Sequence, residues 1–506
     1  MSQGRSGRPR PGYGSQPDSA RDRRHIDPAP LGYESAMATP QSTEDRREAG
    51  YHLTKVIRLA AVAALGGFLF GFDTAVINGA VNAMRDDFGM GAGLTGFVVS
   101  SALLGCMAGA YLAGRLADRW GRLRVMFLAS ALFTASAIGS GLAFGPVDMI
   151  LWRVIGGLGV GAASVIAPAY IAEISPAVVR GRMGSLQQLA IVLGIFVALL
   201  SDYALAGAAG GSAEELWLGL DAWRWMFLVE MVPAIAYGLL AATIPESPRY
   251  LMREGKEERA RIVLATVLKT GIDERIREIK RTLQRERQSS WSQLTKPEGG
   301  LLPIVWIGIA LSVFQQFVGI NVIFYYSSTL WQAVGFTEDD ALAQTVITSI
   351  TNIAVTLVAI ALIDHIGRRR LLMIGSVGMT LSLGTMAWVF SQARVIDGAP
   401  SLEGAAGPTA LVAANAFVVF FGMSWGPAVW VLLGEMFNNR IRGLALGVAA
   451  AAQWLANFAI STTFPAMADF SLWFAYGFYT LMALASLVFV IKFVPETRHK
   501  ELEDMD

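Results

Sequence analysis

The chain has 506 residues, of which 54% are hydrophobic and only 16% are charged. A soluble globular protein does not need that many apolar side chains, so the composition places the chain among membrane proteins, with a lipid bilayer as its surroundings. The 41 Lys and Arg residues nearly balance the 40 Asp and Glu residues, and we expect no nucleic-acid partner. The single cysteine, Cys106, excludes an internal disulfide, and all four histidines lie outside the apolar segments, so we expect neither a metal site nor a bound cofactor.

Residues 1–50 are rich in Ser, Pro, Gly, Arg and Asp and contain almost no large aliphatic side chains. Such a segment cannot form a buried core, so we expect a disordered tail, and it lacks the apolar core of a signal peptide. Twelve apolar segments follow, each close to the length that crosses a bilayer. We place these membrane spans at residues 56–80, 95–114, 123–143, 147–172, 183–204, 223–244, 301–331, 341–363, 371–392, 409–435, 441–467 and 470–493.

One long polar segment, residues 245–300, separates the sixth span from the seventh. Apolar residues recur in it at helical spacing, which predicts short amphipathic helices packed on the cytoplasmic mouth; a solvated tether is the alternative. Lys and Arg are dense in this linker and in the connections after the second, fourth, eighth and tenth spans, whereas the connections after the third, fifth and seventh contain none. By the positive-inside rule both termini and the linker lie in the cytoplasm, and we expect the plasma membrane, the inner membrane of a bacterium.

Three motifs occur twice in the same order, about half the chain apart. The repeated pairs are Gly114–Arg122 with Asp364–Arg369, Glu173 and Arg180 with Glu435 and Arg442, and Pro245–Arg249 with Pro495–Arg498. The repetition predicts two six-helix halves, residues 51–244 and 301–494, with a cytoplasmic tail at residues 495–506. A pair of bundles related in this way binds its substrate between the halves, near the middle of the membrane.

The seventh span carries two adjacent glutamines, Gln315 and Gln316, and Asn321 within a long apolar run. An unpaired amide in hydrocarbon costs several kcal/mol, so these side chains must face a partner, a cavity or a ligand. Gly319 lies between them and marks a point where the helix can bend or open. Hydrogen bonding between helices is the plainer alternative to a binding site.

Taken together, these motifs resemble those of the sugar porters, a family of the major facilitator superfamily, over all twelve spans. The resemblance is carried by Gly114–Arg122, Arg153–Gly161, Pro245–Arg249, Gln315–Tyr326 and Pro495–Thr497. Among members of the family, the chain is most similar to bacterial proton-coupled xylose and hexose symporters, and the human facilitative glucose transporters are more distant. The resemblance implies an all-α membrane protein with the major facilitator fold, in which twelve transmembrane helices form two pseudo-symmetric six-helix bundles.

Asp73 lies well inside the first span, and Arg153 opens the fourth. A carboxylate inside an apolar span is a functional-site hypothesis by default. Burial disfavours the charged carboxylate and a nearby arginine favours it, so a movement that separates the two can load or release a proton. A permanent ion pair between the two spans is the structural alternative. The resemblance favours the proton role, because the proton-coupled relatives carry an aspartate here and the facilitative ones a neutral residue.

A sugar presents hydroxyl groups and small apolar C–H faces, which suit amide side chains and aromatic rings. The resemblance implies that the substrate-binding residues are Gln188, Gln315, Gln316, Asn321, Tyr325, Asn352, Trp430, Gln453, Trp454 and Phe70. We expect Trp425 to pack beside a helix break in the tenth span instead. The resemblance also implies that ion pairs form a gate on the cytoplasmic side. The alternative is that the charged residues of this gate only set the orientation of the chain in the membrane. The gate residues are Asp118, Arg119, Arg122, Glu173, Arg180 and Arg182 in the first half and Asp364, Arg368, Arg369, Glu435 and Arg442 in the second.

These features predict a monomeric, proton-coupled symporter of a monosaccharide, hexose or pentose, that works by alternating access. A facilitative uniporter of the same fold, in which Asp73 is only structural, is the nearest alternative. A sugar sensor that does not transport and a drug-efflux pump are further alternatives. We do not expect an enzyme, because the sequence shows no nucleophile–base pair and no metal-binding cluster.

Overall fold

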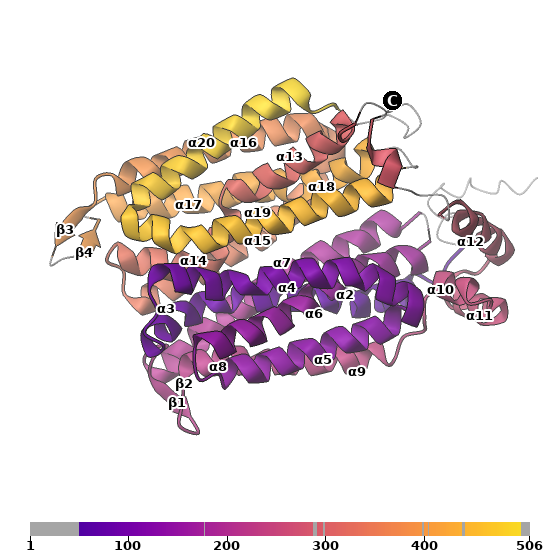
Figure 1. Cartoon of the computed structure of the whole chain (residues 1–506), viewed down its shortest axis with the longest axis horizontal. Helices are drawn as coiled ribbons and strands as arrows, with labels where there is room; N and C mark the ends of the chain where they lie inside the picture. The colour runs from indigo at the N-terminus through magenta and orange to yellow at the C-terminus, as the bar shows by residue number, and fades with distance from the viewer. Residues whose placement is uncertain are drawn as a thin grey trace, which may run out of the picture. The chain divides into compact units, whose positions relative to one another are not determined.

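The computed structural model describes residues 50–176, 178–286, 291–296, 299–396, 399–402, 404–437 and 441–496. Of the expected tails, residues 1–50 and 495–506, all but residues 50, 495 and 496 lie outside the described residues. Within the described part of the chain, twelve helical segments are long and apolar enough to cross a membrane, which confirms the predicted number. The all-α fold with two six-helix bundles is confirmed as well (Figure 1).

The first half contains eight helices for six spans, because single residues, Val76 and Glu230, divide the first and sixth spans, although both keep a right-handed helical backbone. These helices are α2 (Leu53–Ala75), α3 (Ile77–Asp87), α4 (Ala92–Trp120), α5 (Arg122–Gly141), α6 (Pro146–Ile174), α7 (Arg180–Ala209), α8 (Ala222–Val229) and α9 (Met231–Ala241). A short antiparallel hairpin, β1 (Glu215–Trp217) and β2 (Leu220–Asp221), joins α7 to α8. The sequence did not predict this hairpin, whose strands have only three and two residues.

The second half is built in the same way, with breaks in the seventh and tenth spans. Its helices are α13 (Pro303–Phe317), α14 (Ile320–Ala333), α15 (Glu338–Ile366), α16 (Arg368–Phe390), α17 (Ala406–Gly422), α18 (Trp425–Met436), α19 (Arg442–Phe470) and α20 (Leu472–Phe493). A second hairpin, β3 (Arg394–Ile396) and β4 (Ala399–Ser401), precedes α17. The break in the seventh span falls at Gly319, whose φ is +84°, and a Cβ atom there would lie 2.9 Å from the Tyr479 ring. Both the backbone and the packing therefore require glycine at this position.

The linker forms three helices, α10 (Pro248–Arg253), α11 (Glu257–Val267) and α12 (Ile272–Glu286), and a short 3₁₀ helix, η1 (Trp291–Leu294). Buried apolar residues of α10–α12, such as Leu251, Leu264 and Ile276, belong to the same hydrophobic cluster as the neighbouring ends of α2, α5 and α6. The start of α2 is also bonded to the linker backbone, since the His52 N–H donates to the Val267 carbonyl at 2.8 Å. These helices therefore pack as a part of the first half.

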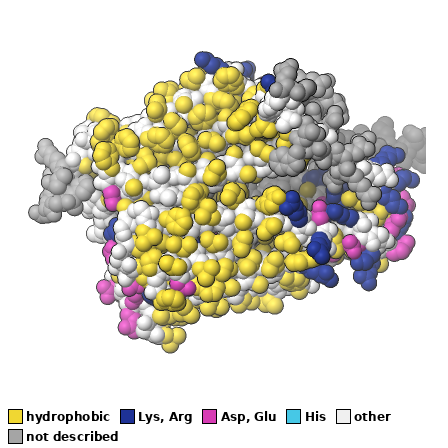
Figure 2. Space-filling model, in the orientation of Figure 1, with side chains coloured by type: hydrophobic (Ala, Val, Ile, Leu, Met, Phe, Trp, Pro, Cys, Tyr) yellow, Lys and Arg dark blue, Asp and Glu magenta, His cyan; other side chains and the backbone are white. Residues whose placement is uncertain are grey.

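The two ends of the bundles differ in charge and in packing. We call the end that carries α10–α12 the linker side and the opposite end, with both hairpins, the hairpin side (Figure 1). Lys and Arg gather at the linker side, and apolar side chains cover the surface between the two ends, as a bilayer requires (Figure 2). On the hairpin side, residues of α3 and α14 share one hydrophobic cluster that spans both halves, whereas the cluster of the linker side is centred on the first half. The halves are therefore packed together on the hairpin side.

Candidate functional site

The buried ion pair lies in the first span, where Asp73 comes three residues before Val76, the residue that separates α2 from α3. Arg153 Nη1, from α6, donates to Asp73 Oδ1 at 3.1 Å and to the Asp73 carbonyl oxygen at 3.2 Å. The side chains of Arg153 and Asp73 are only 2% and 1% exposed, and Asp73 Oδ2 has no hydrogen-bond partner among the described residues. The two residues that the sequence analysis paired therefore meet, in surroundings where a lone charge would cost several kcal/mol.

Two further buried carboxylates were missed by the sequence analysis. Glu230 lies at the break between α8 and α9, is 1% exposed, and interacts electrostatically with Asp73 and Arg153. Asp202 in α7 is fully buried, and its Oδ2 atom accepts a hydrogen bond from the Gly79 N–H at 3.3 Å. Both are isolated acids within apolar spans, so the argument applied to Asp73 would have identified them as well.

A small cavity joins the ion pair to the second half. It is about 10 Å³ in volume, which is about the room that one water molecule needs. Thr74 and Arg153 line it on one side and Tyr325 of α14 on the other. Tyr325, a predicted substrate-binding residue, and Arg153, of the predicted proton site, thus face the same small cavity.

The breaks in the seventh and tenth spans orient the paired glutamines. Gln315 Nε2 donates to the carbonyl oxygens of Trp425 and Gly426, at 3.0 and 3.3 Å, where α18 begins. Gln316 Oε1 accepts from Asn321 Nδ2 at 2.5 Å, across the break at Gly319. Gln315 therefore forms hydrogen bonds between helices, which is the alternative to a binding site that the sequence analysis named. Gln316 and Asn321 bond to each other as one amide pair.

Aromatic residues among the predicted substrate-binding residues make contacts of their own. The rings of Phe70 in α2 and Trp454 in α19 are 5.7 Å apart, so this contact crosses from one half to the other. The Tyr325 hydroxyl accepts from Asn457 Nδ2 at 3.4 Å. Trp425 is fully buried and its indole N–H donates to the Leu372 carbonyl and to Ser376, which is the packing role expected of it.

The other predicted substrate-binding residues make fewer contacts. Within the described part of the chain, the side chains of Gln188, Asn352 and Gln453 make no hydrogen bond to another protein group, and Gln453 Oε1 is buried. Trp430 in α18 is 43% exposed. The side-chain amides of Gln188, Asn352 and Gln453 therefore have donors and acceptors that a ligand could use.

The predicted gate residues form ion pairs inside each half. Arg122 Nη2 lies 2.8 Å from Glu173 in the first half, and Arg368 Nη2 lies 2.8 Å from Glu435 in the second. Arg122 also lies 3.6 Å from Asp118. The pair therefore joins the start of α5 to α6 in the first half and the start of α16 to α18 in the second.

One residue of the linker and one that follows α20, neither selected by the sequence analysis, add to this network. Glu246 accepts from the N–H groups of Arg122 and Leu123, and Glu496 accepts from those of Arg368 and Arg369. Each carboxylate thereby caps the first turn of α5 or α16. The repeated Pro-Glu motif was recognised in the sequence, but its partners lie more than 100 residues away.

The remaining predicted gate residues are not brought into these pairs. Arg119 accepts a hydrogen bond from the Tyr250 hydroxyl through its backbone carbonyl, not its side chain. Arg182 is exposed. Arg369 Nη2 donates to the Ile491 carbonyl. Arg180 lies within electrostatic reach of Arg275 and Glu278 of α12. The side chains of Asp364 and Arg442 lie outside the described part of the chain.

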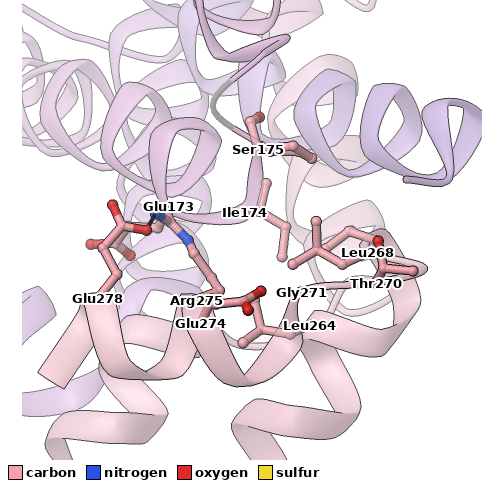
Figure 3. Close-up of a pocket in the computed structure, with 12 residues that line it drawn as sticks. Glu173, Ile174, Ser175, Leu264, Leu268, Thr270, Gly271, Glu274, Arg275 and Glu278 are labelled. Atoms are coloured by element: carbon pink, nitrogen blue, oxygen red, sulfur yellow. Dashed lines mark hydrogen bonds and ion pairs between the residues drawn. The ribbon is translucent and has the colours of Figure 1, made fainter. Parts of the chain in front are cut away.

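A cavity of about 380 Å³ lies beside Glu173, between the end of α6 and the α11–α12 pair (Figure 3). Its charged lining residues are Glu173, Glu274, Arg275 and Glu278. Two carboxylates on the linker and one near the end of α6, all away from the interface between the halves, do not suit the uncharged sugar expected between the halves. We therefore do not assign the substrate to this cavity.

Two pseudo-symmetric six-helix bundles with polar groups buried between them are the architecture of a secondary transporter. The chain belongs to the sugar (and other) transporter family, whose model matches residues 59–506. It is therefore a multi-pass membrane transporter and not an enzyme.

Relatives with high identity are known over almost the whole chain. The glucose transport protein of Synechocystis sp. is 59% identical over 452 residues, which cover 89% of this chain and 97% of the relative. The D-xylose-proton symporter of Escherichia coli is 38% identical over 490 residues, covering 90% and 96%. A solved structure of the E. coli xylose transporter in an inward-open conformation matches with a TM-score of 0.75 and 37% identity, covering 89% of this chain and 99% of that one. The structure of the proton:xylose symporter bound to 6-bromo-6-deoxy-D-glucose matches with a TM-score of 0.73 and 37% identity, covering 90% and 99%.

Proposed function

We propose that this protein is a proton-coupled symporter of a monosaccharide, a hexose such as glucose or a pentose such as xylose. The observation that carries the proposal is the buried ion pair of Asp73 and Arg153, which joins the first span to the fourth. Separating two such charges in a dry interior is costly, because each then lacks its partner. A proton on Asp73 removes one charge and lowers that cost, so protonation and helix movement become linked.

The sugar is held, in this proposal, by the ten substrate-binding residues named from the sequence. The amide pair of Gln316 and Asn321 supplies both donors and acceptors at the break in the seventh span. Phe70 and Trp454 supply rings from opposite halves, so a sugar bound between them contacts both bundles. The names of the relatives, which include glucose and xylose transporters, support both classes of sugar.

Transport follows by alternating access, with the halves opening in turn on the two membrane faces. We propose that the linker side is cytoplasmic, because Lys and Arg gather there, and that both termini lie on that face. The structure, closed on the hairpin side, then corresponds to a state that faces inward. We further propose that the protein acts as a monomer and that the gate residues close the cytoplasmic side when the hairpin side opens.

Uptake into proteoliposomes tests the proposal. The purified protein is reconstituted, and entry of radiolabelled glucose and xylose is followed with and without an imposed pH gradient, acidic outside. We expect at least one of the sugars to accumulate above its external concentration only while the gradient lasts, and a protonophore should abolish this accumulation. Entry that stops at equal concentrations whatever the gradient would instead identify a uniporter.

A further inference from the structure

The hairpin before the sixth span contains a turn that its sequence disfavours. Trp217 pairs with Leu220, so Leu218 and Gly219 alone form the turn, and both have positive φ, 59° and 75°. A two-residue turn of this kind normally has Asn, Asp or Gly at its first central position. Leu218 is the one residue other than glycine with a positive φ in the described part of the chain. A left-handed leucine is strained, because its Cβ crowds the following carbonyl oxygen.

The same leucine is also almost fully exposed. Leu218 is 88% exposed, and its neighbour Trp217 is 54% exposed. In water, the turn would thus combine backbone strain with an apolar side chain that packs against nothing. Moving a leucine side chain out of water is favourable by more than the strain of one left-handed residue costs. An apolar surrounding would therefore account for both the strained backbone and the exposed side chain of Leu218.

The position of the hairpin identifies that surrounding. The Trp217 ring packs edge-on against Trp225, with ring centroids 5.4 Å apart, and the Trp225 indole N–H donates to the Trp217 carbonyl. Trp225 lies in the first turn of the sixth span, which begins at Ala222, directly after β2. The hairpin tip therefore lies at the level where this span enters the membrane (Figure 1).

Trp217 also continues the lipid-facing surface of the sixth span. Trp225 is followed at helical spacing by Val232, Ile235 and Leu239, which are 66%, 43% and 68% exposed. Their spacing puts these residues on one side of the span, where they form an exposed apolar stripe. The hairpin is thus continuous with a surface that lipid covers.

We propose that the β1–β2 hairpin inserts its tip, Trp217 and Leu218, into the interfacial region of the lipid leaflet on the hairpin side. There it anchors the outer end of the sixth span, next to the break that carries Glu230. Tryptophan favours this interfacial level, where its ring is in an apolar environment and its N–H group meets polar groups. The exposed carboxylates of Glu214 and Glu215 at the base of the hairpin fit zwitterionic better than anionic lipid.

Spin labelling tests the proposal on the intact transporter. In a Cys106→Ala background, which removes the chain's only cysteine, a nitroxide is attached to Leu218→Cys and the protein is placed in phosphatidylcholine nanodiscs. Two labelled variants calibrate the measurement: Leu239→Cys on the lipid-facing surface and Asp339→Cys in the exposed first turn of α15. Power saturation then compares collisions with oxygen, which concentrates in lipid, and with a water-soluble nickel complex.

We expect the label at Leu218 to be relaxed more by oxygen than by nickel, as at Leu239 and opposite to Asp339. Trp217→Cys provides a second label site outside the strained turn, so that loss of the turn in one variant does not decide the result. Labels at both positions that behave like the one at Asp339 would overturn the proposal. Spin–spin broadening between labels would also overturn it, because the tip would then be covered by a second copy of the chain.

Discussion

Asn78 in α3 and Ser328 in α14 bond the two halves to each other through both backbone and side chain. The Ser328 N–H donates to Asn78 Oδ1 at 3.1 Å, and the Ser328 hydroxyl donates to the Asn78 carbonyl oxygen. Asn78 Nδ2 donates in turn to the Phe324 carbonyl and to Ser327, both at 2.9 Å. Since α3 and α14 are the outer parts of the first and seventh spans, these contacts close the hairpin side.

Asn78→Ala should therefore favour opening of the hairpin side. The substitution removes three buried hydrogen bonds, each worth about 0.5–1.5 kcal/mol net, so the equilibrium should shift by roughly tenfold or more. A cysteine at Val99, which lines the small cavity between the halves, should react faster with a membrane-impermeant maleimide added outside. Ser130→Ala, which removes a bond to Ala234 within the first half, is the control and should leave the rate unchanged. Equal rates in the Asn78 and Ser130 variants would contradict a closing role for Asn78.

Asp73→Asn should abolish pH-driven accumulation of sugar. The amide keeps nearly the shape of the protonated carboxyl group but has no charge to load on one side and release on the other. Sugar binding and exchange of sugar for sugar should persist at least in part, because Asp73 is not among the proposed sugar contacts. Counterflow and gradient-driven uptake, measured in the same proteoliposomes, separate these activities. Uphill uptake that survives in the variant would exclude Asp73 as the proton carrier.

Gln316→Ala and Trp430→Ala should each weaken sugar binding while leaving the helix content unchanged. A buried hydrogen-bonding group left without its partner costs about 1–3 kcal/mol, so affinity should fall by roughly one to two decades in the Gln316 variant. Asn415→Ala is a matched control, because Asn415 is another amide in an apolar span, bonded to Leu411 in its own helix. Binding measured by calorimetry should separate the control from both variants. Unchanged affinity in both would place the pocket elsewhere.

Glu173→Gln and Glu435→Gln test the gate in the two halves separately. Each neutralises a carboxylate that pairs with an arginine at 2.8 Å within its own half. Because these pairs are already formed in the inward-facing structure, the prediction concerns contacts between the halves that form when the cytoplasmic side closes. Without the carboxylate charge we expect inward-facing forms to be favoured and turnover to slow more than sugar binding weakens. Glu254→Gln in the linker is the control, because its pair with Lys256 is exposed and such pairs contribute little. The readout is the labelling rate of a cysteine placed in the cytoplasmic cavity. Rates equal to that of the control would remove these residues from the gate.

Gly319→Ala should lower the thermal stability of the transporter. The left-handed backbone and the Tyr479 ring at 2.9 Å both oppose a side chain there, and strain of this kind costs about 1–3 kcal/mol. Gly477→Ala is the matched control, since Gly477 lies within α20 and a Cβ there would meet no atom within 4 Å. Alanine favours a helix over glycine, so the control should be neutral or slightly stabilising. Equal melting temperatures for the two variants would contradict the requirement for glycine at the break.

The twelve spans could be predicted because the thickness of the bilayer imposes a length on every apolar run. The break in the seventh span could be predicted too, since Gly319 interrupts that run beside polar residues. The meeting of Asp73 with Arg153 followed from the cost of burying either charge alone. In these cases the local sequence and the solvent decide the structure.

Contacts between distant segments were harder to predict. Glu246 and Glu496 lie in recognised motifs, but their role as caps depends on folding that brings the end of each half back to α5 or α16. The bonds of Gln315 to α18 depend on where the tenth span breaks. The β1–β2 hairpin was missed because its turn, Leu218-Gly219, lacks the usual Asn-Gly pattern.

Because α10–α12 pack on the first half, we expect the linker helices to move together with that half. His52 and Lys269 fix the linker backbone to the start of the chain's first span, and its apolar residues are shared with that half. A distance measured by spin or fluorescent labels from α12 to the cytoplasmic end of α16 therefore reports how far the halves have separated on that face. The same distance should shorten when the hairpin side opens, so one label pair can follow the whole transport cycle.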